Sequence, residues 1–429
     1  MSDRFVVFNA RLIDPASGRD ETGGVVVENG QILEAGAHVH PPASPSPADL
    51  DARGLCLSPG LIDLRVKTGE PGGENKETLE TASAAAAAGG VASFVMMPDT
   101  DPVIDSLALV DFITRRARDR ADVKVYPAAG LTLGLKGERM SEIGLMHEAG
   151  AVMFSNGDQA VEDAGVLRRA MMYATGFDAL IASRPDTHTL TRGAVMNSGA
   201  FAGRLGLRGA PPEAEWIALA RDLILAETTG ARLLIDTLST ARSLETVEQA
   251  RARGLKVACS AAAYSLVFNE IDVGDYLTYC KVFPPFRPES DRLALIDGVK
   301  RGVIDAVVSA HDPQPPEDKR LPIADAAFGA VGLETLLSAL LGLVAEGRLT
   351  LLEALRPLTS GPADLLGLPQ GRLATGAPAD LVLFDPDAPW LCLRENLVSR
   401  SKNSPFDGRR LTGRVHRTYV DGRLIFRRG

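Results

Sequence analysis

Residues 59–72 read Pro-Gly-Leu-Ile-Asp-Leu-Arg-Val-Lys-Thr-Gly-Glu-Pro-Gly, an apolar run that enters a glycine-containing loop, as a buried β-strand does. Helical segments separate most of the runs of this kind, for example residues 76–88, which Gly89–Gly90 closes as a C-cap. The eight runs are 61–66, 91–97, 123–127, 151–154, 178–183, 232–236, 256–260 and 306–310. Eight strands alternating with helices predict an α/β fold, a (β/α)8 TIM barrel, over residues 59–357.

The two chain ends have a different pattern, in which apolar and polar residues alternate between turn signals. The pair Asn29–Gly30 separates two such stretches and is typical of a β-hairpin. Apolar runs beside turns return at 376–385 and 418–425. We therefore expect residues 1–58 and 358–429 to form one β-sandwich that flanks the barrel.

The bulk composition argues against several classes of function. The formal net charge of −9 over 429 residues disfavours nonspecific binding to nucleic acid or to an anionic membrane. Charged residues interrupt every long apolar stretch, and residues 1–7 lack the apolar core of a signal peptide. The four cysteines are scattered without a Cys-x-x-Cys motif, which is typical of a reduced compartment. We expect a cytoplasmic protein with no membrane span.

The stretch 59–72 resembles the first barrel strand of the dihydroorotase branch of the amidohydrolases. That family carries His-x-His after Ile-Asp-x and an arginine before Glu-Pro-Gly, where this chain has Arg65, Lys67 and Gly69. The resemblance covers nearly the whole chain and is most specific in five segments: 97–100, 204–209, 221–227, 281–287 and 328–335. It implies the barrel fold and an ancestor that hydrolysed cyclic amides with zinc. Because these segments are mostly structural, they indicate ancestry rather than activity.

The functional positions of that family hold other residues here. Where the resemblance implies an acidic residue after strand four and ligands after strands five and six, the chain has Asn156, Ser183 and Thr237. Ala310 takes the place of the aspartate that serves as ligand and base after strand eight. Two positions that contact substrate in the family are Asp99 and Phe283. Cationic side chains repel a metal, so we predict no catalytic residue, no zinc and no other cofactor.

Two weaker candidate sites stay open. His311 and Asp312 follow strand eight and could belong to an atypical catalytic or metal site. Four aspartates near strand ends could offer oxygen ligands to Mg²⁺ or Mn²⁺: Asp63, Asp99, Asp236 and Asp312. We instead expect these aspartates to neutralise Arg65 and Lys67, because buried cations need partners.

The remaining histidines and arginines are expected to be structural or solvated. The other five histidines are His38, His40, His147, His188 and His416. Arg208 and Arg287 fit structural salt bridges. Four arginines near the C-terminus are typical of a solvated strand face, with a contact to a partner as the alternative: Arg409, Arg410, Arg414 and Arg417.

The resemblance implies a dihydroorotase-like protein of pyrimidine biosynthesis that performs no catalytic step. Some bacteria pair such a homologue with aspartate carbamoyltransferase, and it holds the transferase in an active assembly. This partner is therefore implied, with a homodimer inside the larger complex. The alternative is an active dihydroorotase or related cyclic-amide hydrolase with an atypical metal site, which would require zinc. A third hypothesis is a small-molecule sensor that binds an anion through Arg65 and Lys67.

Overall fold

The computed structural model describes residues 4–44 and 46–429. Its centre is a parallel barrel whose strands coincide with the eight apolar runs: β6 (Leu61–Val66), β7 (Val91–Met96), β8 (Lys124–Gly130), β9 (Met153–Ser155), β10 (Leu180–Ser183), β13 (Arg232–Ile235), β14 (Val257–Ala262) and β15 (Ala306–Val308). The hydrogen-bonded order is β15-β14-β13-β10-β9-β8-β7-β6, so each barrel strand lies beside the next. The predicted (β/α)8 barrel is confirmed.

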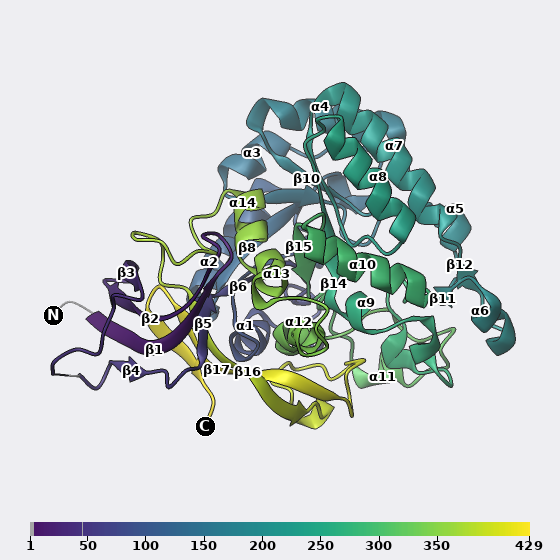
Figure 1. The fold of residues 1–429 in the computed structure, drawn as a ribbon. Coiled ribbons are helices and arrows are strands. Elements are labelled where there is room, and N and C mark those ends of the chain that lie inside the picture. The colour runs from purple at the N-terminus through teal and green to yellow at the C-terminus, as the bar shows by residue number, and fades with distance from the viewer. Residues whose placement is uncertain (1–3, 45) are drawn as a thin grey trace.

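Helices surround the barrel strands (Figure 1). They are α1 (Leu79–Ala88), α2 (Leu107–Arg120), α3 (Ile143–Glu148), α4 (Ala164–Ala174), α5 (His188–Thr191), α6 (Ala200–Leu205), α7 (Glu213–Thr229), α8 (Ala241–Ala252), α9 (Ala263–Val267), α10 (Glu289–Arg301), α11 (Pro316–Lys319), α12 (Leu336–Ala345), α13 (Leu351–Leu355) and α14 (Ser360–Leu366). A short parallel pair, β11 (Met196–Asn197) and β12 (Gly209–Ala210), flanks α6 in the sequence. Helix α14 follows residue 357, where the sequence suggested that the barrel ends. No helix in the described part of the chain is long and apolar enough to cross a membrane.

The first helix of the barrel begins later than the sequence suggested. The expected helix at 76–88 starts at Leu79, because Thr78 caps it and forms a reciprocal capping box with Thr81. Gly90, just past its end, adopts a φ of 81°, a conformation that glycine reaches without strain.

Asp63 joins the first and last strands of the barrel. Its carboxylate accepts hydrogen bonds from the backbone N–H of Ser309, just past β15, at 3.2 Å, and from that of Arg65 at 3.1 Å. The next contact along this seam is the backbone N–H of Lys67, which donates to the carbonyl of His311 at 2.9 Å. Burial raises the pKa of Asp63 to about 6, against the effect of these hydrogen bonds. The seam between β6 and β15 is closed by these contacts.

Strands from both chain ends form one flanking sheet. Its members are β1 (Arg4–Asp14), β2 (Arg19–Glu28), β3 (Gln31–Gly36), β4 (Leu50–Asp51), β5 (Cys56–Pro59), β16 (Leu381–Leu391), β17 (Arg410–Val420) and β18 (Arg423–Arg427). The order is β18-β17-β16-β5-β1-β2-β3, with β4 paired to β1. The predicted turn Asn29–Gly30 joins β2 and β3 with φ values of 51° and 80°, as a two-residue hairpin requires.

The N-terminal and C-terminal strands of this sheet share a core. The ring of Phe5 stacks on that of Tyr419, with centroids 5.4 Å apart. Val25, Leu381 and Leu383 belong to the same buried cluster. Figure 1 shows the purple N-terminal strands and the yellow C-terminal strands together at one side of the barrel. The expectation that both chain ends build one flanking β unit is confirmed.

Lys124 ties the barrel to this sheet. Its Nζ lies 2.8 Å from Asp380 Oδ2, just before β16, and 2.7 Å from Asp421 Oδ1, in the turn between β17 and β18. The side chain of Asp380 is only 1% exposed, so its charge depends on this lysine. Burial nevertheless raises the pKa of Asp380.

We predict that Lys124→Met lowers the free energy of unfolding by about 2 kcal/mol, since it leaves a buried carboxylate unpaired. The double variant Lys124→Met/Asp380→Asn should recover part of this loss, because the stranded charge is gone. Urea unfolding followed by circular dichroism measures both, with the exposed Lys300→Met as control. An equal loss in the single and double variants would contradict the role assigned to Lys124.

Candidate functional site

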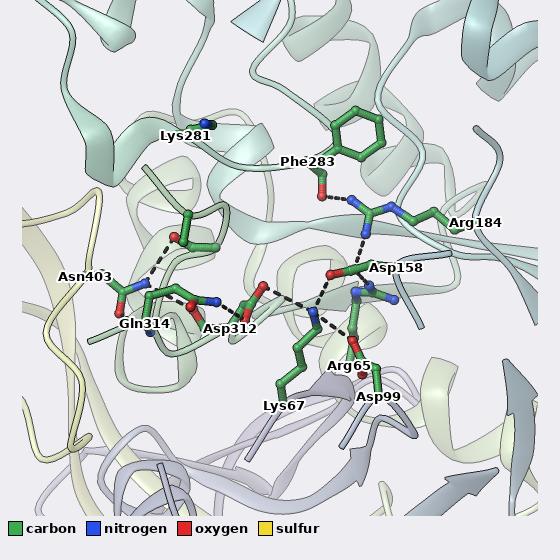
Figure 2. Close-up of polar contacts among 12 residues, drawn as sticks. Arg65, Lys67, Asp99, Asp158, Arg184, Lys281, Phe283, Asp312, Gln314 and Asn403 are labelled. Atoms are coloured by element: carbon green, nitrogen blue, oxygen red, sulfur yellow. Dashed lines mark hydrogen bonds and ion pairs between the residues drawn. The ribbon is translucent and has the colours of Figure 1, made fainter. Parts of the chain in front are cut away.

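Asp158 lies at the C-terminal mouth of the barrel, in the loop after β9. Its carboxylate contacts three cationic side chains: Arg65 of β6, Lys67 just after β6, and Arg184 just after β10. The distance from Arg65 Nη2 to Asp158 Oδ1 is 2.6 Å. Figure 2 shows the three cations converging on this one carboxylate.

Three further carboxylates surround these cations. Asp236 accepts a hydrogen bond from Arg65, and Lys67 Nζ lies 2.9 Å from Asp99 Oδ2 and 3.3 Å from Asp312 Oδ2. Three cations thus face four carboxylates. We call these seven residues the mouth cluster: Arg65, Lys67, Arg184, Asp99, Asp158, Asp236 and Asp312. The expectation that aspartates neutralise Arg65 and Lys67 is confirmed for Asp99, Asp236 and Asp312.

The mouth cluster keeps its central groups ionised. Burial alone would lower the pKa of Arg65 and Lys67, but the carboxylates outweigh burial and raise both pKa values. Burial would likewise raise the pKa of Asp158, but the charges of Lys67 and Arg184 hold it well below its usual range. The barrel mouth therefore holds fixed, mutually compensating charges.

The space enclosed between the side chains of the mouth cluster is small. A cavity of about 30 Å³ remains between its side chains and those of Tyr264, Phe283 and Phe328. Sites for small organic molecules measure roughly 300–1,000 Å³, whereas a cavity of this size holds about one water molecule. A larger molecule can enter this space only if side chains of the cluster move.

The side chains at the mouth do not fit a zinc ion. Zinc needs three or four convergent His, Cys, Asp or Glu ligands. Across residues 4–44 and 46–429, no group of three such side chains is arranged to hold a metal. Arg65 and Lys67 stand at the two positions where the sequence resemblance implies the histidine ligands of the first barrel strand. The aspartates around them are bound to cations. The donor set present is a set of ion pairs, not a metal-binding set.

Three of the positions identified from the sequence are engaged in other hydrogen bonds. The Asn156 side-chain oxygen accepts from the backbone N–H of Thr132 at 3.0 Å. The Ser183 hydroxyl donates to Asp222 at 2.6 Å, and the Thr237 hydroxyl donates to the preceding carbonyl at 2.7 Å. These side chains stabilise loops and the packing of α7, so they are not part of the mouth cluster.

The remaining predicted positions border the cluster. Phe283 places its ring 4.7 Å from the guanidinium carbon of Arg184 and accepts a hydrogen bond from that residue through its carbonyl. Ala310 lines the small cavity with a φ of 48°, an uncommon conformation for alanine. Gly69, with a φ of 75°, lines an adjacent open cleft of about 320 Å³, which Lys67, Asp99 and Asp312 of the mouth cluster also line.

His311 makes a structural contact on the inner side of the mouth. Its Nε2 lies 3.5 Å from Glu77 Oε2, and both side chains are fully buried. Its Nδ1 accepts a hydrogen bond from the backbone N–H of Gly332 at 3.3 Å. Glu77 also accepts from Ser399 and from the backbone N–H of Arg400 at 3.0 Å. His311 therefore helps to bind the segment 397–404 to the barrel.

That segment, between β16 and β17, reaches across to the mouth. The Asn403 side chain donates to the carbonyls of Asp312 and Gly329, each at 3.1 Å. It also accepts from the backbone N–H of Gln314 at 3.1 Å. Figure 2 shows Asn403 and Gln314 beside Asp312. The C-terminal part of the chain thus fixes the loop that carries Asp312.

One expectation about the aspartates is wrong. Asp63 does not neutralise Arg65 or Lys67; its carboxylate accepts backbone N–H groups at the barrel seam. Sequence reasoning also missed Asp158 and Arg184 as members of the site. The available signals were their places at the ends of the fourth and fifth strands, and the need of Arg65 and Lys67 for a shared counter-charge.

Comparison with known proteins identifies the family. The chain matches the dihydro-orotase-like family over residues 54–243 and the amidohydrolase family over residues 223–425. It is 42% identical over 415 residues to a dihydroorotase-like protein of Pseudomonas aeruginosa, and the alignment covers 97% of each chain. It is 39% identical over 424 residues to a dihydroorotase of Syntrophotalea carbinolica, and that alignment covers 99% of each chain. This chain belongs to the dihydroorotase-like family of the amidohydrolases.

The fold is shared with solved members of the amidohydrolase group. The L-hydantoinase of Arthrobacter aurescens superimposes with a TM-score of 0.89 at 27% identity, covering 100% of this chain and 97% of that one. The dihydropyrimidinase of Brevibacillus agri gives 0.85 at 21% identity, covering 99% and 95%. The barrel and the flanking sheet of this chain therefore share the fold of these solved structures.

The mouth cluster should be a major source of stability. We predict that Asp158→Asn lowers the free energy of unfolding by about 2–3 kcal/mol, because three cations lose their shared partner. This predicted loss of stability is smaller than that for breaking a fully buried ion pair, since the Asp158 side chain is 38% exposed and solvent screens its charge. Chemical denaturation measures the change against Asp119→Asn, whose side chain is 68% exposed. A loss below about 0.5 kcal/mol would contradict the central role of Asp158.

Asp63 should give stability a recognisable pH dependence. Its pKa of about 6 lies above the roughly 3.9 of an unfolded aspartate, so the folded state binds more protons between these values. The contribution of Asp63 to stability should therefore decrease as pH rises from about 4 to about 6, by roughly 2–3 kcal/mol. Unfolding measured at several pH values should show this loss in the wild type but not in Asp63→Asn. Parallel pH profiles would refute the assignment.

Proposed function

We propose that this protein is a catalytically inactive member of the dihydroorotase-like family that acts in pyrimidine biosynthesis. The observation that carries the proposal is the convergence of Arg65, Lys67 and Arg184 on Asp158 at the barrel mouth. The sequence resemblance implies that Arg65 and Lys67 take the positions of the family's first metal ligands, and the cavity enclosed by the network, about 30 Å³, is small for a cyclic amide. Ala310 supplies no base at the end of the last strand.

The proposed role is that of a structural partner of aspartate carbamoyltransferase, with a homodimer inside the assembly. The chain aligns with 97–99% of the length of two of its relatives, and its mouth is filled with ion pairs. A protein that retains its scaffold without its reactive groups can still act through surface and shape. The family resemblance directs that role to the transferase.

We predict that this protein and the aspartate carbamoyltransferase of the same cell form a complex that survives gel filtration. Stable interfaces of this kind bury about 1,200–2,000 Å² or more, enough to persist at micromolar concentration. Co-expression should give one high-mass peak with higher transferase activity than the transferase alone. The double variant Arg65→Ala/Lys67→Ala shows which part of the protein forms the complex. Loss of the complex in the folded variant would point to the mouth, and an unchanged complex would point to the surface. Separate elution with unchanged transferase activity would remove the support for this role.

A second function is favoured by a specific observation, the 39% identity to a protein named dihydroorotase. In that case the chain hydrolyses a cyclic amide through an atypical metal site that includes Asp312 and His311. The test is turnover of dihydroorotate and carbamoyl aspartate by protein freed from host enzyme, with and without added zinc. We expect none, and Ala310→Asp should not create it, because ligands that act as a unit are not additive. Zinc-dependent turnover by the wild type would establish the second function instead.

The sensor hypothesis receives less support from the geometry. Arg65 and Lys67 are already paired with carboxylates, so neither offers an uncompensated charge to an anion. An anion would also have to displace Asp158 from both side chains.

A further inference from the structure

The C-terminal hairpin is strongly cationic in an acidic protein. Residues 409–428 contain seven arginines and one carboxylate, Asp421, whereas the whole chain has a formal charge of −9. Asp421 is already bound to Lys124 on the barrel. Asp421 therefore does not neutralise the arginines of β17 and β18, and this hairpin carries a net positive charge.

Most of these arginines have no carboxylate partner. Arg409 and Arg423 pair with Asp272 and Asp122, at 2.9 and 3.4 Å. Within residues 4–44 and 46–429, the other five have no carboxylate oxygen within 4.0 Å: Arg410, Arg414, Arg417, Arg427 and Arg428. Arginine without a partner is easily solvated at a surface, so this feature alone does not define a site.

The strand register places two of them directly opposite each other. Arg417 of β17 pairs with Arg427 of β18, so their side chains project from the same face of the sheet. At the next position, the backbone N–H of Arg428 donates to the carbonyl of His416 at 2.9 Å. Like charges directly opposite in an antiparallel pair are destabilising. In the free protein no carboxylate within the described residues offsets this pair, although Arg417 donates a hydrogen bond to the Tyr419 hydroxyl at 3.4 Å.

A groove runs along this pair. It measures about 430 Å³, and its cationic lining consists of Arg417, Arg427 and Arg428 from the hairpin and Arg53 from the loop after β4. Its single carboxylate, Asp51, is held by hydrogen bonds from the Asn9 side chain and the Arg53 backbone N–H, both at 3.0 Å. In Figure 1 the C-terminus lies close to β4 and β5.

The groove also has an apolar wall. Leu50 and Leu55 line one side and Leu383 of β16 lines another. Charges on an edge strand can serve only to prevent sheet-to-sheet pairing, and β18 is such an edge. That purpose does not account for Arg417, which lies on the inner strand β17, or for Arg53 across the groove.

We propose that this groove binds an extended acidic segment of a partner protein, in which carboxylates alternate with apolar side chains. Guanidinium groups bind carboxylates in a planar, two-point geometry, and the opposed pair Arg417 and Arg427 gains a counter-charge on binding. Leu50 and Leu55, which are half-buried, are covered by the apolar side chains of the segment. A phosphate compound satisfies only the cations and leaves the apolar wall in water, so the mixed lining favours a peptide.

The test uses the full chain and a fluorescent eight-residue peptide of alternating glutamate and leucine. Arg427→Glu should weaken binding of this peptide about tenfold, whereas Arg168→Glu, an exposed arginine of α4, should leave it unchanged. Rising salt should weaken binding to the wild type. Equal loss in both variants would show nonspecific charge attraction and overturn the proposal. Tighter binding of inorganic tripolyphosphate than of the peptide would assign the groove to phosphate compounds and also overturn it.

A second readout needs no ligand. Arg427→Glu replaces a like-charge pair by an opposite-charge pair, so the melting temperature of the free protein should rise while peptide binding falls. Raising the salt concentration should reduce that gain. A lower melting temperature for Arg427→Glu at low salt would show that Arg427 is a structural residue, against the proposal.

Discussion

The carboxylate of Asp158 is the constraint on which the mouth of this barrel depends. Two strand ends project cations into the same space, and a buried cation without a partner costs several kcal/mol. Asp158 lies where it can contact Arg65, Lys67 and Arg184 together. The other carboxylates of the mouth cluster, such as Asp236, complete the charge balance. These ion pairs hold the side chains at the mouth in place.

These ion pairs explain how the scaffold accommodates Arg65, Lys67 and Arg184 at the barrel mouth. The strand seam is closed by Asp63, and the segment 397–404 fixes the loop after β15 through Asn403. The flanking sheet is bound to the barrel by Lys124. None of these contacts requires a reactive group. The molecule therefore presents an intact surface, and its cationic groove at the C-terminal hairpin is one part of that surface on which a partner can act.

Much of this architecture could be predicted from the sequence, because buried parallel strands appear as short apolar runs with helices between them. The pairing of Arg65 and Lys67 with aspartates was also predictable, since a buried cation requires an acidic partner. The identity of the central acid was not, because Asp158 lies in a loop 93 residues from Arg65. The contact between Asp158 and Arg65 is set by the conformation of this loop, which the periodicity of apolar residues does not reveal. The role of Asp63 was missed for the same reason, since its partner Ser309 is 246 residues away.

The most direct test of the account is the metal content of the protein. It should be purified without chelator, incubated with zinc, desalted and analysed by inductively coupled plasma mass spectrometry beside a zinc-binding dihydroorotase. The account predicts only a trace of zinc, well below about one ion per chain, because Arg65 and Lys67 hold the aspartates of the mouth cluster in ion pairs. Retention of about one or two ions per chain, lost in Asp312→Asn, would contradict it and show that the mouth cluster opens to hold a metal.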